Sequence, residues 1–285
     1  MLPNDMKTLE GIRFGEERAL YGSRELHLKN CAFAGDEDGE SALKESSRIR
    51  VEKTLCELRY PFWHTEEIEI LDSRMTETCR AALWYSKEIL LRDTYLHGTK
   101  ALRECESISM EGCDVISQEF GWFCRGIEIS DTTARGEYFM LRAKDLKISQ
   151  LHFSGKYSFQ YIENAVIDHC ELDTKDAFWH AKNVTVKNSL VKGEYLGWYS
   201  EGLTLINCKI VGTQPLCYCK DLRLVDCEMI DTDLAFERSW VDATLTTPIQ
   251  SIKNPYAGSI TAPHAGEIIL DDPCAECKIT VTQSL

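Results

Sequence analysis

LTLINCKIVG at residues 203–212 and LRLVDCEMID at residues 222–231 begin 19 residues apart and share one pattern of residue types. In each segment apolar residues alternate with polar ones, and a cysteine, Cys208 or Cys227, stands five positions after the first leucine. Alternation with a period of two is typical of a β-strand that buries one face. The two segments therefore indicate a repeated strand unit.

The same unit recurs along most of the chain. Its first feature is a pair of aliphatic residues two positions apart, and the pairs are Leu26/Leu28, Ile49/Val51, Ile68/Ile70, Ile89/Leu91, Ile108/Met110, Ile127/Ile129, Leu146/Ile148, Ala165/Ile167, Val184/Val186, Leu203/Leu205 and Leu222/Leu224. From Ile49 onward the spacing is 19 residues, with a single step of 21, and the polar insertion GDEDGESALKESS lengthens the step before Ile49 to 23. A fixed period of this length indicates a repeat architecture.

Two further columns show where each unit turns. A small residue follows the second aliphatic residue by three positions in most units, and these residues are Thr54, Ser73, Thr94, Cys113, Thr132, Cys170, Ser189, Cys208 and Cys227. Asp, Asn or Gly usually stands just before it, and these residue types tolerate the left-handed backbone of a sharp turn. Short strands joined by tight turns predict an all-β fold, a right-handed single-stranded parallel β-helix with about 19 residues per rung and ten to twelve rungs.

Other solenoids fit this pattern less well. A left-handed hexapeptide β-helix needs a six-residue pattern, which is absent, and leucine-rich repeats place an Asn three residues after a Leu, whereas Asn207 follows Leu205 by two. We expect a single domain over residues 1–285, with an N-terminal cap at 1–25, repeat rungs at 26–240 and a C-terminal capping segment at 241–285.

The composition limits the cellular location and the classes of binding partner that we expect. The chain has 285 residues, 44% hydrophobic and 27% charged, with a formal net charge of −14. This charge argues against nucleic acid and anionic membranes, because both attract clustered Lys and Arg. No stretch has the apolar length of a membrane span, and the N-terminus lacks the pattern of a secretory signal. We expect a cytoplasmic protein whose 13 cysteines are reduced and mostly packed as small hydrophobic residues.

The tripeptide FWH occurs twice, ending at His64 and His180. The two histidines are 116 residues apart, which is six periods of 19 plus the two extra residues of the longer step. They should therefore lie roughly 29 Å apart on one stripe and cannot share a catalytic centre. From the alternation along a strand, we expect the Trp column to face the core and the His column to face outward.

The units LTLINCKIVG and LRLVDCEMID resemble the right-handed β-helix superfamily typified by pectate lyases. More closely, nearly the whole chain is similar to a bacterial β-helix family known only as a domain of unknown function. The resemblance implies the fold and little chemistry. Polygalacturonase-like glycosidases combine Asn-Thr-Asp, Asp-Asp, His-Gly and Arg-Ile-Lys motifs. This chain has only isolated His97-Gly98 and Asp271-Asp272, and no Asp cluster with a catalytic Arg of the pectate-lyase type.

The outward face offers a candidate ligand site. Leu102, Met140, Phe159, Phe178 and Leu216 are expected there beside the His column, and an exposed apolar and aromatic patch marks a ligand or partner surface. The ligand-binding candidates are Arg142, Tyr161, His180, Tyr199, Tyr218, Glu237 and Phe178. Aromatic rings stack on sugars and polar groups bind hydroxyls, so the first hypothesis is a carbohydrate-like ligand, bound and possibly processed by a hydrolase or lyase.

No catalytic residue can be assigned from the sequence. Hydrolysis of a glycosidic bond needs two carboxyl groups, and Glu104, Glu194, Asp176, Asp233 and Glu237 are candidates of which spacing singles out no pair. The alternative hypothesis is a non-enzymatic scaffold that uses the same face for homo-oligomerisation or protein binding. Cys274 and Cys277 form a lone CxxC, so we expect no metal site and no cofactor.

Overall fold

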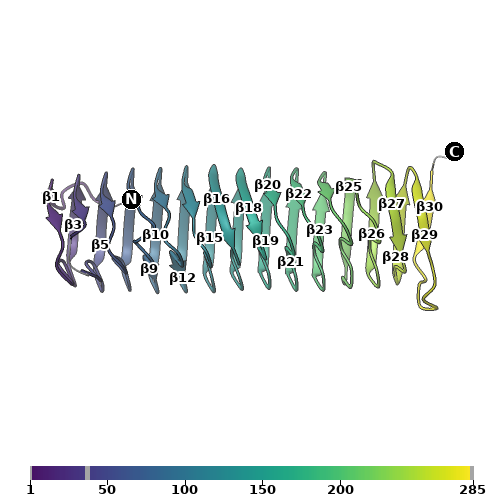
Figure 1. Cartoon of the computed structure of the whole chain (residues 1–285), viewed down its shortest axis with the longest axis horizontal. Coiled ribbons are helices and arrows are strands. Elements are labelled where there is room, and N and C mark those ends of the chain that lie inside the picture. The colour runs from purple at the N-terminus through teal and green to yellow at the C-terminus, as the bar shows by residue number, and fades with distance from the viewer. Residues whose placement is uncertain (1, 36–38, 283–285) are drawn as a thin grey trace. The chain divides into compact units, whose positions relative to one another are not determined.

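The computed structural model describes residues 2–35 and 39–282, and all the regular secondary structure in these residues is β-strand. The chain divides into two compact units, residues 1–144 and 145–285, each built of short strands stacked turn upon turn (Figure 1). No helix that could cross a membrane occurs in the described part of the chain.

In the first unit, one strand of every turn belongs to a continuous parallel ladder. These strands are β1 (Lys7–Glu10), β3 (Arg24–Lys29), β5 (Ser47–Glu52), β7 (Glu66–Leu71), β10 (Lys87–Arg92), β13 (Glu106–Glu111) and β15 (Arg125–Ser130). Their register pairs Ile49 with Ile68, and Ile68 with Ile89, so the aliphatic column found in the sequence is one stripe of the sheet.

Shorter strands build the other sides of each turn in this unit. A second parallel ladder contains β2 (Arg13–Phe14), β4 (Ala32–Phe33), β6 (Leu55–Cys56), β8 (Arg74–Met75), β11 (Tyr95–Leu96), β14 (Asp114–Ile116) and β16 (Thr132–Glu137). A third side pairs β9 (Leu83–Trp84) with β12 (Leu102–Arg103).

The second unit repeats this plan. Its main ladder contains β17 (Lys144–Ser149), β19 (Glu163–Asp168), β21 (Lys182–Lys187), β23 (Glu201–Ile206), β25 (Leu222–Ile230), β26 (Trp240–Leu245), β28 (Ala257–Ala262) and β30 (Lys278–Val281). The second side contains β18 (Leu151–Lys156), β20 (Glu171–Asp173), β22 (Leu190–Lys192) and β24 (Lys209–Val211), and near the C-terminus β27 (Ile249–Lys253) pairs with β29 (Ala265–Ile269).

The predicted parallel β-helix of about 19 residues per turn is confirmed, with about 14 turns and not ten to twelve. The difference arises at the ends, because β1 pairs in register with β3 before residue 26, and β28 and β30 continue the ladder after residue 240. The assignment of a single domain with two caps stays a prediction.

The core consists of the aliphatic columns. Ile49, Val51 and Leu203 are fully buried, and burying a side chain of this size contributes about 1.5–3 kcal/mol. The column of small residues is also buried, and its side chains form hydrogen bonds with the backbone there. Ser189 donates its hydroxyl proton to the Lys187 carbonyl at 2.7 Å and accepts the Cys170 backbone N–H at 3.0 Å, so each small residue closes the corner between two strands.

One predicted face is wrong. Leu102, Met140, Phe159, Phe178 and Leu216, expected on the outside, are at most 2% exposed. Phe178 stacks on Phe159 inside the second unit, with ring centroids 5.3 Å apart. The backbone at Phe178 and His180 is left-handed, with φ of 60° and 54°, so the side chains there do not alternate as in a flat strand.

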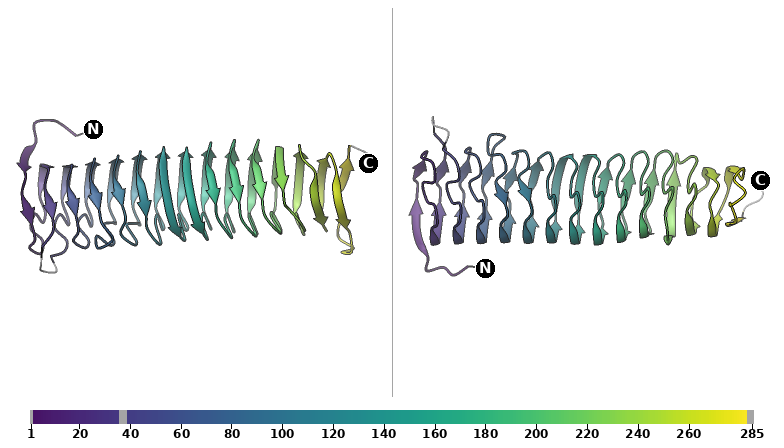
Figure 2. Two further views of the ribbon diagram at one scale, coloured as in Figure 1. Left: turned by 45° about the horizontal axis from the view of Figure 1, so that its top comes forward. Right: turned by 90° about the horizontal axis from the view of Figure 1, so that it is seen from below.

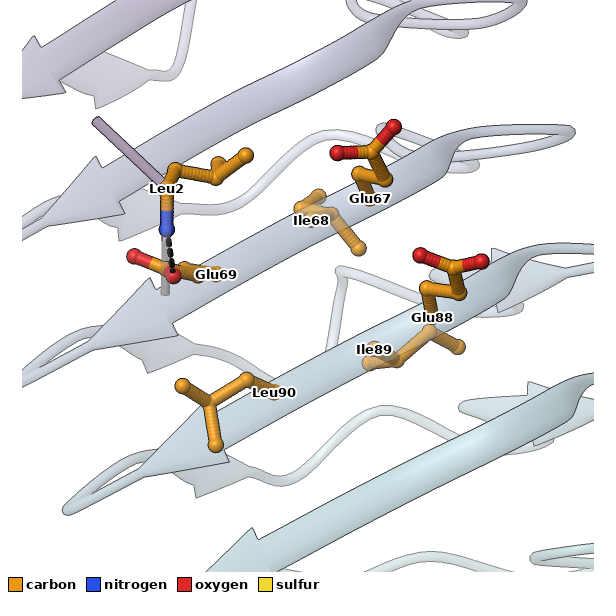
Figure 3. Close-up of a pocket in the computed structure, with 7 residues that line it drawn as sticks. All are labelled: Leu2, Glu67, Ile68, Glu69, Glu88, Ile89 and Leu90. Atoms are coloured by element: carbon orange, nitrogen blue, oxygen red, sulfur yellow. Dashed lines mark hydrogen bonds between the residues drawn. The ribbon is translucent and has the colours of Figure 1, made fainter. Parts of the chain in front are cut away.

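The chain before β1 runs back along the outside of the first unit (Figure 2). Arg50 binds the Leu2 carbonyl at 2.7 Å and Asn4 Oδ1 at 3.1 Å, and the Leu2 N–H donates to Glu69. Leu2 thereby forms one wall of a shallow depression of about 200 Å³ over β7 and β10, drawn in Figure 3. Its other lining residues are Glu67, Ile68, Glu69, Glu88, Ile89 and Leu90.

Candidate ligand-binding face

Four of the predicted site residues form a continuous stack in the second unit. Tyr161, His180, Tyr199 and Tyr218 lie on successive turns, with neighbouring ring centroids 4.8, 5.0 and 4.9 Å apart and interplanar angles of 11°, 9° and 12°. We call this row the aromatic ridge.

The backbone of the turns fixes the ridge. All four residues have left-handed backbone, with φ between 54° and 61°. Each backbone N–H donates to a carbonyl of the following turn, for example His180 to Trp198 at 2.9 Å and Tyr218 to Glu237 at 2.7 Å. Residues with the same backbone conformation on turns one strand spacing apart send their side chains in the same direction, so the rings stack.

The ridge presents ring edges to solvent. Tyr161 is 37% exposed and Tyr199 is 46% exposed, which confirms that the His column lies outside. The faces of His180 are covered by Tyr161 and Tyr199, and burial lowers the pKa of its imidazole. A sugar therefore cannot stack on the inner rings, whereas the ring edges remain available for contact.

A charged group closes one end of the ridge. The Tyr218 hydroxyl donates to Glu237 Oε2 at 3.3 Å, and Lys253 pairs with Glu237 Oε1 at 3.1 Å. Burial, followed by the negative charge of Glu237, raises the pKa of Tyr218. The predicted residues Tyr161, His180, Tyr199, Tyr218 and Glu237 are thus brought together.

The remaining two predicted residues differ in burial. Phe178 lies in the core, as described above. Arg142 is exposed on residues 1–144, in the other compact unit.

The tryptophans beside the ridge are half-buried, so the prediction of a core Trp column is wrong. Trp179 and Trp198 stack with centroids 5.5 Å apart at 5°, and their indole N–H groups donate to the Tyr195 and Gln214 carbonyls at 2.7 and 2.8 Å. The indoles bind backbone of the next turn, and this accounts for the repeated tryptophan. FWH is a structural repeat, since Trp63 makes the same bond to the Ala81 carbonyl.

Of the five carboxylates considered for catalysis, Asp176 is the one whose pKa is raised, chiefly by burial. It is 6% exposed and its carboxyl group makes no hydrogen bond within the described chain. Glu194 pairs with Lys175 at 2.8 Å, and Glu104 accepts a hydrogen bond from Arg103 at 3.2 Å.

Cysteines do not gather into a metal site. No group of three or more His, Cys, Asp or Glu side chains in residues 2–35 and 39–282 is arranged to hold a metal ion. The cysteines are free thiols, and burial raises the pKa of Cys113 and of Cys219 to about 11.

The sequence reasoning missed a set of cations on aromatic rings in the first unit. The Trp column there reads Lys44, Trp63, Trp84, Arg103 and Trp122. Lys44 lies 5.6 Å from the Trp63 ring centroid, and Arg103 lies 5.1 Å from that of Trp84 and 5.5 Å from that of Trp122. Arg103 is half-buried and contacts both rings. The presence of Lys44 and Arg103 in the same column as three tryptophans was the available signal.

Fold and ridge together define a parallel β-helix protein with an aromatic outer surface. The chain belongs to the family described as "Protein of unknown function (DUF3737)", whose model matches residues 7–282. No curated protein sequence matches the chain.

Several solved β-solenoids are distantly similar. The A-module of a mannuronan C-5 epimerase from Azotobacter vinelandii has a TM-score of 0.36 and 9% identity, over 85% of this chain and 89% of that one. The surface adhesin PfbA of Streptococcus pneumoniae has a TM-score of 0.38 and 9% identity, over 84% of this chain and 78% of that one. HetL, a pentapeptide repeat protein from Nostoc, has a TM-score of 0.30 and 13% identity, over 78% of this chain and 92% of that one. Similarity this distant says nothing about what the present chain binds.

Proposed function

We propose that this chain is a binding protein and that the aromatic ridge of residues 145–285 holds a carbohydrate-like ligand. The observation that supports this is the row of four stacked rings, two of them more than a third exposed, ending in the hydrogen-bonded Tyr218, Glu237 and Lys253. A surface that alternates apolar ring edges with hydroxyl, imidazole and carboxylate groups matches a ligand that alternates C–H and O–H groups.

The mode of binding follows from the stacking. Because the inner ring faces are covered, the ligand lies across the ridge and binds through hydrogen bonds to the polar groups of the ring edges. Each such bond contributes only about 0.5–1.5 kcal/mol, so an extended oligosaccharide that contacts several turns is favoured over a single sugar.

A thermal-shift panel of neutral and acidic oligosaccharides tests the proposal. A ligand at 100 times its dissociation constant stabilises the folded protein by about 2.7 kcal/mol. His180→Ala and Tyr199→Ala should abolish the shift. Tyr95→Ala is the control, since Tyr95 is 50% exposed and lies in the other unit. A panel in which no sugar shifts the transition would refute the carbohydrate ligand.

The covered ring faces also favour a second candidate, a non-enzymatic scaffold whose ridge contacts another protein or a second copy of the chain. Tyr and Trp are enriched at protein interfaces, where their edges hydrogen-bond and their sides exclude water. Light scattering tests contact with a second copy, which predicts a dimer or higher oligomer of the wild type and a monomer for Tyr199→Ala.

A further inference from the structure

A second aromatic cluster, in the first unit, is surrounded by positive charge. The Tyr60 and Trp63 rings lie 4.6 Å apart at 44°. Arg59 and Arg80 lie over Tyr60, with guanidinium carbons 5.6 and 6.0 Å from the ring centroid, and Lys44 lies 5.6 Å from the centroid of Trp63. We call these five residues the cationic corner.

The turns of the β-helix bring these residues together from separate stretches of sequence. The Tyr60 N–H donates to the Arg80 carbonyl at 3.1 Å, which sets Arg80 one turn beyond Tyr60. The Glu45 N–H donates to the Trp63 carbonyl at 3.0 Å, which sets Lys44 one turn before Trp63. The inter-turn ladder therefore fixes the backbone positions of Arg80 and Lys44 relative to Tyr60 and Trp63.

Two of the three cations pair with no carboxylate among the residues that the structure describes. Arg59 pairs with Glu40 at 3.4 Å, but Arg80 and Lys44 pair with no carboxylate in residues 2–35 and 39–282. In a chain with a net charge of −14, two cations on aromatic faces without a carboxylate partner among the described residues are candidates to bind an anionic group.

Beside the corner lies a depression of about 380 Å³ that provides room for a ligand. It is lined by Glu57, Leu58, Arg59, Glu77, Thr78, Arg80 and Thr99. The two arginines offer N–H donors to an anionic group. The two glutamates repel further negative charge and accept hydrogen bonds from hydroxyl groups. The chemistry selects one anionic group on a hydroxylated framework.

We propose that the cationic corner and this depression form a binding site for a small ring compound that carries one carboxylate and several hydroxyl groups. The carboxylate lies between Arg59 and Arg80, the hydroxyl groups contact Glu57, Glu77 and the threonines, and the ring packs against Leu58, the apolar residue of the lining. The site lies in residues 1–144, so it is separate from the aromatic ridge and goes beyond the function proposed for it.

Titration calorimetry with three probes tests the site. Shikimate carries a ring, hydroxyl groups and a carboxylate, its methyl ester lacks the charge, and acetate lacks the ring. We expect shikimate to bind and the other two to bind at least about tenfold more weakly, because hydrogen bonds to a charged group are the strong ones. Equal binding of acetate and shikimate overturns the ring contact, equal binding of the ester overturns the carboxylate contact, and no binding of shikimate overturns the site.

Variants separate this site from other surface charges. Arg80→Gln should weaken shikimate binding about tenfold or more, because it removes an exposed guanidinium that pairs with no carboxylate. Arg92→Gln is the control, since Arg92 is exposed but pairs with Glu111 at 3.0 Å away from the corner. Equal affinity in both variants contradicts the assignment. Tyr199→Ala should leave shikimate binding unchanged, so a failure of the ridge and a failure of this site give different results.

Discussion

Gln160 occupies the position that Trp179 and Trp198 occupy on the next two turns, and its side chain makes the same kind of bond. Its Nε2 donates to the Asp176 carbonyl at 2.9 Å, as the indoles donate to the Tyr195 and Gln214 carbonyls. The side chains at this position therefore share an N–H group that reaches the following turn, and apolar bulk alone does not account for them.

Trp198→Phe tests this role. Phenylalanine keeps an aromatic ring but leaves the Gln214 carbonyl without the indole donor, so the free energy of unfolding should fall by about 1 kcal/mol in a urea titration. Trp240→Phe is a matched control, because Trp240 is 53% exposed and its indole makes no hydrogen bond in the described chain. An equal loss in both variants would count against the inter-turn bond.

The burial of Asp176 should make the stability of the folded protein depend on pH. Burial raises the pKa of its carboxyl group in the folded protein, so the folded state is most favoured while the group is protonated. The stabilisation is full below the unfolded pKa, about 3.9, and is lost as pH rises through the folded pKa. Asp176→Asn cannot ionise, so its melting temperature should exceed that of the wild type at pH 7, and the gap should shrink toward pH 4.

The control for Asp176 is Asp173→Asn. Asp173 is exposed and pairs with Lys192 at 3.2 Å, so its replacement should not raise the melting temperature at pH 7. A lower melting temperature for Asp176→Asn at pH 7 would show that the ionised carboxylate is stabilised by its surroundings.

The residue columns could be predicted from the sequence, but for some of them it could not be predicted whether the side chains point into the core or outward. The period identified the aliphatic core, the small column and the outward His column correctly. The outward assignment of Phe178 and the inward one of Trp179 assumed an extended strand. Left-handed residues at Phe178 and His180 break that alternation, and non-glycine residues in this conformation give no simple sequence signal.

At the scale of elements, the N-terminal segment acts as a strap. Arg50 and Glu69 form an ion pair at 2.8 Å with side chains only 12% and 7% exposed, and both hold Leu2. The strap thus covers a charge pair that would otherwise face water on the outside of β5 and β7.

Arg50→Leu should release the strap. Removing one partner of a buried pair costs about 3 kcal/mol, and amide exchange at Leu2 should accelerate because its contacts are lost. Arg92→Leu is the comparison, since the Arg92–Glu111 pair is 44% and 56% exposed and its loss should cost less than about 1 kcal/mol. Unchanged exchange at Leu2 would mean that the strap is held by other contacts.

The strands at the two ends of the chain could not be predicted from the sequence. β1 contributes only Leu9 to the aliphatic column at the position of Leu28, and the step from Val241 to Gly258 is 17 residues and not 19. A repeat search finds columns and fixed steps, so it counts fewer turns where the sequence is polar or the step length changes at either end.

At the scale of the molecule, the stacked turns protect the cysteine thiols. Of the 13 cysteines, 11 are buried, and burial raises the pKa of Cys217 to about 12. A colorimetric thiol reagent at pH 8 should therefore react rapidly with the exposed Cys274, more slowly with the half-buried Cys277, whose pKa burial raises to about 11, and with the rest only in denaturant. Rapid reaction of three or more thiols without denaturant would contradict the closed core.

The central functional claim is that the aromatic ridge binds a carbohydrate-like ligand across several turns. The most direct measurement is calorimetric titration of the best oligosaccharide from the panel into the wild type and into the double variant Tyr161→Ala/Tyr199→Ala. Both tyrosines are exposed, so the variant should fold, and loss of two ring contacts should weaken binding at least about tenfold. Equal affinity of the two proteins, or no measurable binding by the wild type, would contradict the claim.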